Sequence, residues 1–310
     1  MRVAQAFSPG GISSLFAVRD RDSQGLPIKV LDQIGALGGG FVIKKGVTTR
    51  VEVCRSRKNS IKVVINNRLA PEAMTTRAVV NKILSLADKN YNVRIKHKVD
   101  IPIGAGFGAS GAGALSTALA LSRLFNLPLS YNQIGMIAHH AEIEAKTGLG
   151  TVAPLMIGGC VLSIKPGGPG IAVIDRILTP AQTRILAIHI SPIYTKSILG
   201  ETGLRERINT WGEQALTRIQ RQPALETFFR YSLQFAKKLG LITPRLRKVI
   251  RVLQDEGAIG VTQNMVGEAA HAAFMTGETV QIAKKMRRVF PSYQVLISDI
   301  DQTGVRLIEE

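Results

Sequence analysis

A glycine-rich segment between a predicted strand and a predicted helix constrains the fold of this chain more than any other stretch. Residues 101–125 read IPIGAGFGASGAGALSTALALSRLF and hold five glycines before a run of small and apolar side chains. The preceding NVRIKHKVD, residues 92–100, alternates apolar and polar residues and predicts a half-buried strand. Glycine has no Cβ, so backbone amides in such a turn can surround an anion, and a helix starting near Ser110 adds unpaired N–H donors. We therefore expect a phosphate-binding loop here.

Three other glycine motifs fit these residues less well. Gly106, Gly108 and Gly111 match the dinucleotide-binding pattern G-x-G-x-x-G, but the acidic residue expected about 20 positions later is missing. Ser110 nearly matches a hydrolase nucleophile elbow, but Pro102 and the glycines interrupt the strand that should lead into it. No Lys-Ser or Lys-Thr comes after the glycines, so the segment is not a Walker loop. Tight packing of a helix on a sheet, without any ligand, remains the alternative.

Composition narrows the class of protein. Of the 310 residues 45% are hydrophobic and 20% charged, as in a folded chain with a large core. Lysine and arginine outnumber acidic residues by 40 to 22, and the net charge of +18 attracts anions. Aromatic residues are only 5%, which disfavours a base-stacking surface, so we expect no nucleic-acid partner.

Cysteine usage and hydropathy indicate the compartment. Cys54 and Cys160 are too few for a disulfide framework, which favours a reducing environment. The start of the chain lacks the apolar core of a signal peptide, and five glycines make the uncharged residues 101–122 a poor membrane span. We expect a cytoplasmic protein with no membrane partner.

Strand and helix patterns interleave along the chain and predict an α+β fold in two domains. The first 50 residues predict strands and glycine turns, with SPGGISS and GALGGG among the turns. Helices are expected over about 70–89 and from the capping-box residues Ser130 and Gln133 to Gly148. A second domain begins with the strand RILAIHIS, so we place the junction near residues 166–183.

Three motifs in order along the chain resemble the GHMP kinases, the family of galactokinase, homoserine kinase and mevalonate kinase. Pro102–Ser110 matches the family's P-x-x-x-G-x-G-x-S motif, and SPGGISSLF at Ser8–Phe16 is similar to its N-terminal Pro-Gly motif. The stretch AHHAEIEAKTGLGTVAPLMIGG resembles the family's segment just after the motif helix. The resemblance implies a two-domain fold: a ribosomal-S5-domain-2-like α+β domain over residues 1–175 and a ferredoxin-like α+β domain over residues 176–310.

The resemblance also implies an activity. The segments FSPGGIS, TGLGTVAPLMIGG, QNMVGEAAHAAF and VLISDIDQTGVRLI are closest to the archaeal pantoate kinase branch. Members of that branch use ATP to phosphorylate pantoate to 4-phosphopantoate, a step towards coenzyme A. Two alternatives stay open: a kinase of the same fold that acts on another small hydroxy acid or alcohol, and a nucleotide-binding regulatory protein without turnover.

The family's site residues can be carried onto matching positions. The resemblance makes Ser110 and Glu142 the catalytic ligands of Mg²⁺, both being the hard oxygen ligands that this ion prefers. Without the resemblance, Glu142 would be taken as part of a solvated helix face. ATP would bind to the glycine loop itself: Pro102, Gly104, Ala105, Gly106, Phe107, Gly108, Ala109, Ser110 and Gly111.

The chain departs from the family pattern at two places that concern catalysis and substrate. Thr151 stands where many members have an aspartate, and a threonine cannot accept a proton at neutral pH, although it can orient a hydroxyl group. GALG at Gly35–Gly38, with Ala36, replaces a Gly-Ser-Arg-Gly segment of the pantoate branch.

A hydroxy-acid substrate needs a cation to bind its carboxylate. Lys165 is the first candidate and Arg19 the second, with His139 as a residue that lines the substrate pocket. His139 and His140 point about 100° apart on a helix and cannot hold one metal together. The residues TQNMVG, 262–267, are expected to face the substrate. The expected partners are ATP and a small hydroxy acid, and a homodimer is left open.

Overall fold

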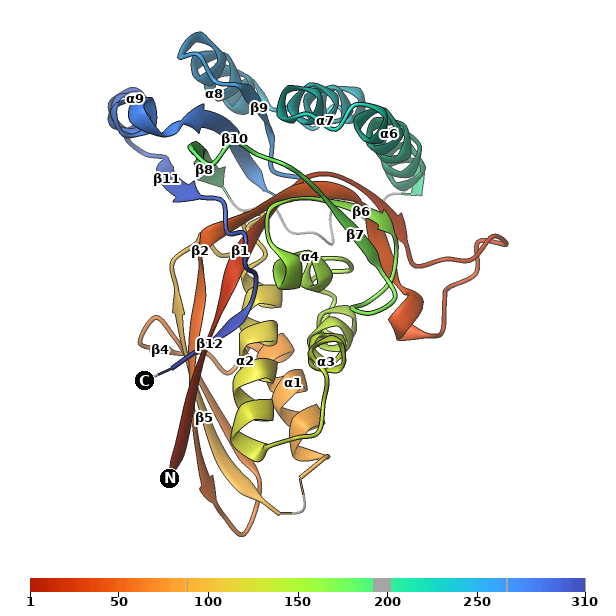
Figure 1. Ribbon diagram of the computed structural model, residues 1–310, viewed down its shortest axis with the longest axis vertical. Helices are drawn as coiled ribbons and strands as arrows, with labels where there is room; N and C mark the ends of the chain where they lie inside the picture. The colour runs from red at the N-terminus through yellow and green to blue at the C-terminus, as the bar shows by residue number, and fades with distance from the viewer. Residues whose placement is uncertain (88, 192–201, 266, 310) are drawn as a thin grey trace.

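The computed structural model describes residues 1–87, 89–191, 202–265 and 267–309. A mixed eight-stranded sheet forms its lower part (Figure 1). The main path runs β12-β1-β2-β5-β3-β4; β6 pairs with β2, and β7 with β6. Among the described strands of this sheet, β3 and β5 alone are parallel neighbours. The strands are β1 (Arg2–Arg19), β2 (Gly35–Arg55), β3 (Ser60–Ile65), β4 (Arg68–Leu69), β5 (Tyr91–Val99), β6 (Cys160–Lys165), β7 (Val173–Ile177) and β12 (Arg306–Ile308).

Helices α1, α2 and α4 pack against this sheet, α3 packs on these three helices, and a short 3₁₀ helix, η1 (Leu31–Gln33), contacts α3. Helix α2 is buried over almost its whole length, as its run of small and apolar residues predicts. The predicted capping box of α3 is confirmed, since Ser130 accepts from the Gln133 amide and the Gln133 side chain accepts from the Ser130 amide. The helices are α1 (Met74–Leu84), α2 (Ala109–Phe125), α3 (Tyr131–Glu144) and α4 (Val152–Ile157).

A second, antiparallel sheet lies above the first (Figure 1). Its order is β11-β8-β10-β9, with β8 (Thr183–Ser191), β9 (Gly260–Gln263), β10 (Glu268–Met275) and β11 (Gln294–Asp299). Numbered by their order in the sequence, the four strands lie across the sheet as 4-1-3-2, which confirms the expected ferredoxin-like arrangement. The helices of this part are α6 (Thr202–Arg221), α7 (Leu225–Leu239), α8 (Pro244–Asp255) and α9 (Thr276–Val289).

The predicted glycine turns in the first 50 residues are wrong. SPGGISS lies within β1 and GALGGG within β2, and the two strands pair along their lengths with two register shifts. Their glycines permit close contact of backbones: a Cβ at Gly40 would lie 2.1 Å from the Ile12 carbonyl oxygen, and one at Gly46 would lie 2.1 Å from that of Ser8. The glycines therefore keep two long strands together rather than turning the chain.

One hydrophobic cluster joins the two sheets. Phe41 on β2 stacks on Phe229 of α7 at 5.3 Å between ring centroids and contacts Phe228 edge-on at 5.2 Å. The same cluster includes Phe107 of the glycine loop. The loop is therefore anchored where the two halves of the molecule pack together.

The strand arrangement crosses the proposed domain boundary at residue 175. β7 extends to Ile177 within the first sheet, and β12 returns to that sheet to pair with β1. The division into 1–175 and 176–310 stays a prediction. No helix within the described ranges is long and apolar enough to cross a bilayer.

Candidate active site

The glycine loop joins β5 to α2 and alternates between two backbone conformations. Gly104, Gly106 and Gly108 have φ of +72°, +74° and +65°, whereas the intervening Ala105 and Phe107 do not lie in the left-handed region. Alternation of this kind turns successive N–H groups toward one concave face, as in anion-binding nests. The side chains of Ala105 and Phe107 are buried and fix the loop to the core. The glycine positions are more exposed.

The amides of this loop are available to a ligand. Among the described residues, no backbone carbonyl or side chain accepts a hydrogen bond from the amides of residues 106–111. Ala109 is the first residue of α2, so these donors also lie at the positive end of a helix dipole. The carbonyl of Phe107, in contrast, accepts from the Gly11 amide at 3.0 Å. The loop is thus held by a carbonyl while its amides remain unbound.

A buried carboxylate lies beside the start of α2. Glu142 of α3 is only 1% exposed. Its Oε1 accepts from Ser110 Oγ at 2.7 Å and from Thr147 Oγ1 at 3.2 Å. Its Oε2 is buried and has no hydrogen-bond partner within the described part of the chain. Burial raises the pKa of Glu142, and the hydroxyl groups of Ser110, Thr147 and Thr151 counter that rise only in part.

Thr151 packs against the start of α2 next to this carboxylate. It is the N-cap residue of α4, and its methyl group lies 3.0 Å from where a Cβ of Gly108 would be and 3.1 Å from that of Gly111. A Cβ at Gly111 would also lie 2.8 Å from Glu142 Oε2. The structure therefore brings together Ser110, Glu142 and Thr151, the three residues predicted to be catalytic, around the N-terminus of α2.

The donors of this cluster fit magnesium. A buried carboxylate oxygen without a partner and a neighbouring hydroxyl are hard oxygen ligands, and Mg²⁺ often takes only one or two protein ligands beside substrate phosphates. Within the described ranges no group of three or more His, Cys, Asp or Glu could enclose a metal. The site therefore suits an ion shared with a phosphate ligand rather than an all-protein cage.

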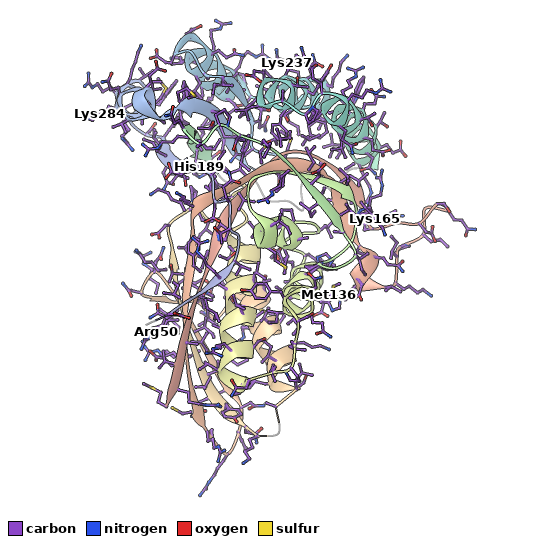
Figure 2. The ribbon with its side chains drawn as sticks, in the orientation of Figure 1. Arg50, Met136, Lys165, His189, Lys237 and Lys284 are labelled. Carbon is purple, nitrogen blue, oxygen red and sulfur yellow. The ribbon has the colours of Figure 1, made fainter. Side chains whose placement is uncertain are left out.

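The three residues predicted to bind substrate have different surroundings. Lys165 is exposed at the end of β6, and Figure 2 shows it beside the curved end of the first sheet. Arg19 forms an ion pair with Glu213 of α6. His139 is 2% exposed, and its Nε2 donates to the Ile34 carbonyl at 3.0 Å, so it acts here as a packing residue.

The residues predicted to face the substrate contact the glycine loop. The Met265 amide donates to the Ser13 carbonyl at 3.0 Å, and a Cβ at Gly267 would lie 2.7 Å from the Ala105 carbonyl oxygen. Val266 lies outside the described residues. Ala36 belongs to the GALG segment that departs from the family pattern. It lies against Gly150, because a Cβ built on Gly150 would be 3.0 Å from the Ala36 Cβ. Both segments therefore border the glycine loop and the Thr151 turn.

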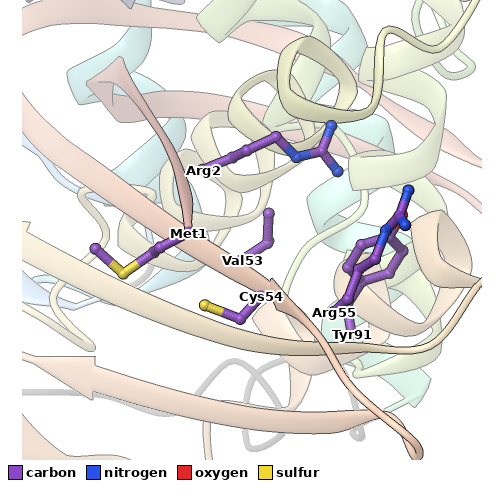
Figure 3. A pocket seen from close by; sticks show the side chains of 6 residues that line it. All are labelled: Met1, Arg2, Val53, Cys54, Arg55 and Tyr91. Carbon is purple, nitrogen blue, oxygen red and sulfur yellow. The ribbon is translucent and has the colours of Figure 1, made fainter.

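A cavity of about 490 Å³ lies elsewhere (Figure 3). It is near the C-terminal end of α2, because Arg2 in its wall donates to the Leu124 carbonyl at 2.8 Å. A helix of this length separates it from the glycine loop by about 25 Å. Its lining consists of Met1, Arg2, Val53, Cys54, Arg55 and Tyr91.

Comparison with known proteins places the chain in a family. Residues 75–159 match the family model described as the GHMP kinases N terminal domain, and this range contains the glycine loop, Glu142 and Thr151. A pantoate kinase of Methanospirillum hungatei is 32% identical over 92% of this chain and 91% of its own length. The chain belongs to the GHMP kinase family.

Solved structures agree with this assignment. A structure described as a phosphotransferase related to the CoA biosynthesis pathway covers 99% of both chains with a TM-score of 0.88 and 26% identity. Homoserine kinase from Cytophaga hutchinsonii has a TM-score of 0.73 at 17% identity, over 99% of this chain and 98% of its own. The expected α+β GHMP kinase fold is confirmed, and this protein is a small-molecule kinase.

Sequence reasoning missed several residues that shape the site of this kinase. Thr147 holds the Glu142 carboxylate, and Gly11 binds the carbonyl of Phe107. Both lie within segments that resemble family motifs, TGLG and SPGGISS. Their roles depend on contacts between distant elements, which no local pattern records.

Proposed function

We propose that this kinase transfers the γ-phosphoryl group of ATP to the hydroxyl group of pantoate, giving 4-phosphopantoate. The observation that carries the phosphoryl-transfer part is the unpartnered carboxylate oxygen of Glu142 beside Ser110 and the unbound amides of the glycine loop. The pantoate part is supported by the similarity over 92% of the chain to an archaeal protein named pantoate kinase.

Each group in the site has a distinct part in this proposal. The amides of residues 106–111 bind the polyphosphate, and Ser110 and Glu142 hold Mg²⁺. A bound Mg²⁺ supplies positive charge that neutralises the phosphate oxygens. Oε1 of Glu142 is held by two hydroxyl donors, so the carboxylate keeps one orientation and presents Oε2. Lys165 is the cation proposed for the carboxylate of the acceptor.

Thr151 replaces an acid, and the chemistry tolerates that replacement. Phosphoryl transfer has a loose transition state and depends mainly on positioning and charge stabilisation. General-base catalysis contributes about 10²–10⁴-fold, so its absence slows the reaction without abolishing it. Thr151 lies over the start of α2, where its hydroxyl group can orient the hydroxyl group of the acceptor.

The substrate is tested by measuring ADP release with ATP, MgCl₂ and a panel of acceptors: pantoate, homoserine, glycerate and mevalonate. Release that depends on pantoate supports the proposal. Release with another acceptor alone would assign a different alcohol. Thermal stabilisation by ATP without turnover of any acceptor would indicate a regulatory protein.

The site is tested separately by Ser110→Ala. Loss of this hydroxyl removes a proposed metal ligand and one donor to Glu142, so turnover should fall by about 100-fold or more. Ser122→Ala, a buried serine near the other end of α2, is the matched control and should keep near-normal turnover. Equal rates for the two variants would contradict the site assignment.

A further inference from the structure

Three buried polar side chains connect the second sheet and β1 to the glycine loop. Ser14 of β1, His271 of β10 and Asn264 after β9 are each 0% exposed. Ser14 Oγ lies 2.8 Å from His271 Nε2, and His271 Nδ1 lies 2.8 Å from Asn264 Oδ1. Asn264 Nδ2 reaches the Ala105 carbonyl oxygen at 3.4 Å. The proposed catalytic cluster contains none of these three residues.

The hydrogen bonds that link these three residues to the glycine loop all run in one direction, from the Ser14 hydroxyl to the Ala105 carbonyl. Asn264 Oδ1 can only accept, so Nδ1 of His271 carries the hydrogen. Burial lowers the pKa of His271 to about 3, so the ring is neutral and its Nε2 accepts from the Ser14 hydroxyl. Asn264 then donates through its Nδ2 to Ala105. Hydrogen bonds aligned in this way polarise and strengthen one another.

The last acceptor in this series of hydrogen bonds, the Ala105 carbonyl, is part of the proposed phosphate-binding nest. The carbonyl of Ala105 belongs to the same planar peptide unit as the amide of Gly106, so fixing one fixes the other. The peptide unit between Phe107 and Gly108 is held in the same manner, because the Gly11 amide donates to the Phe107 carbonyl at 3.0 Å. The peptide units that carry the amides of Gly106 and Gly108 are therefore held by donors from two different parts of the fold.

We propose that Ser14, His271 and Asn264 are positioning residues that set the orientation of the Gly106 amide for the nucleotide phosphates. This inference rests on the proposed function, because it assumes that ATP binds at the glycine loop. The three residues provide a link by which the second sheet controls nucleotide affinity. The serine and histidine do not form a nucleophilic pair, since the Ser14 hydroxyl is fully buried and no substrate can reach it.

The test compares Asn264→Leu and Ser14→Ala with a matched control, Thr76→Val. Thr76 of α1 also contacts a buried histidine, at 3.1 Å from His97 Nε2, but this contact does not lead to the glycine loop. Ser14→Ala and Thr76→Val should lower the melting temperature by similar amounts, because each leaves a buried histidine nitrogen without its partner. The dissociation constant for Mg-ATP is measured by calorimetry, together with kcat and KM.

Loss of the Asn264 donor should weaken Mg-ATP binding by about 2–10-fold, the worth of one hydrogen bond, and Ser14→Ala should weaken it less. Thr76→Val should leave the affinity unchanged. In the double variant, Ser14→Ala should have no further effect on affinity, because Asn264→Leu has already removed the hydrogen bond that connects Ser14 and His271 to the glycine loop.

Two outcomes would overturn the inference. One is unchanged Mg-ATP affinity in Asn264→Leu. The other is an effect of Ser14→Ala that persists in full in the double variant. Failure of the wild-type kinase to bind Mg-ATP would instead refute the proposed function, so the two failures are distinguishable.

Discussion

At the residue scale, Glu142 is almost completely buried, and no positively charged group of the described residues shifts its pKa. In the described part of the chain no ion pair involves it, and only hydroxyl groups donate to it. A carboxylate in such a place lowers the stability of the protein when no cation is bound, because burial penalises its charged form. Residues that serve a reaction are often the ones that destabilise the fold.

Glu142→Gln should therefore raise the stability of the ligand-free kinase while abolishing turnover. The amide keeps an acceptor for Ser110 and Thr147 but carries no charge, so its burial costs less and the free energy of unfolding at neutral pH should increase. Because the pKa of Glu142 is raised on folding, its share of stability is present below pH 4.5 and is lost as the pH rises through the folded-state pKa. The gain of the variant should accordingly disappear near pH 4.

Urea unfolding of both proteins at several pH values measures this difference, with EDTA present to remove metal. Differential scanning with added MgCl₂ and ATP supplies a second readout, since only the wild type should gain stability from magnesium beyond that from nucleotide. A variant less stable than the wild type at neutral pH would contradict the electrostatic argument.

At the scale of single elements, α2 carries two glycines that differ in whether the neighbouring residues leave room for a side chain. A Cβ at Gly111 would lie 2.8 Å from Glu142 Oε2 and 3.1 Å from the Thr151 methyl group, so neither neighbour leaves room for it. A Cβ at Gly113 would lie 3.6 Å from the His97 ring, an ordinary contact. An added methyl group would therefore press on the Glu142 carboxylate at Gly111 and would fit at Gly113.

Gly111→Ala should lower turnover by about tenfold or more, because it displaces the carboxylate of Glu142. Gly113→Ala should keep turnover and stabilise the kinase by up to about 1 kcal/mol, since alanine is the better helix residue. Steady-state kinetics and thermal unfolding of the pair measure both effects. Equal losses of turnover in the two variants would show that the tight contact at Gly111 does not matter.

These elements also show what the sequence could predict. Helix α2 and its glycine loop were predictable, because loop glycines and a run of small apolar residues are local signals. The glycines of SPGGISS and GALGGG wrongly predict turns within β1 and β2, because a glycine in a close strand pair cannot be told from a glycine in a turn without knowing its neighbour. The contact of Asn264 with Ala105 joins residues far apart in the chain, and no periodicity predicts such a bond.

At the scale of the whole molecule, each sheet buries a histidine among hydroxyl groups or aromatic rings. Burial lowers the pKa of His97 to about 4 and that of His271 to about 3, from an ordinary value of 6.5. Both rings are neutral in the folded kinase, and both become protonated below pH 6.5 in the unfolded chain. The contribution of these two histidines to stability is therefore full above pH 6.5 and falls as the pH decreases through about 4 to about 3.

His97→Gln should remove part of this acid sensitivity. A histidine whose pKa falls from 6.5 to about 4 on folding makes the stability decrease by on the order of 3 kcal/mol as the pH falls from 6.5 to 4, and glutamine causes no such decrease. Denaturant unfolding at pH 7.5, 6.0 and 4.5 should give a shallower pH dependence for the variant. The same slope in both proteins would contradict the buried, neutral state of His97.

The return of β12 to the first sheet has a consequence for synthesis on the ribosome. β1 emerges early, but the strand that pairs with its residues Gln5–Phe7, Arg306–Ile308, emerges only after almost all the rest of the chain. Until then β1 presents an open row of N–H and C=O groups, which neighbouring nascent chains on a polysome could engage. This part of the β1 edge therefore stays open to such contacts until the last strand has been synthesised.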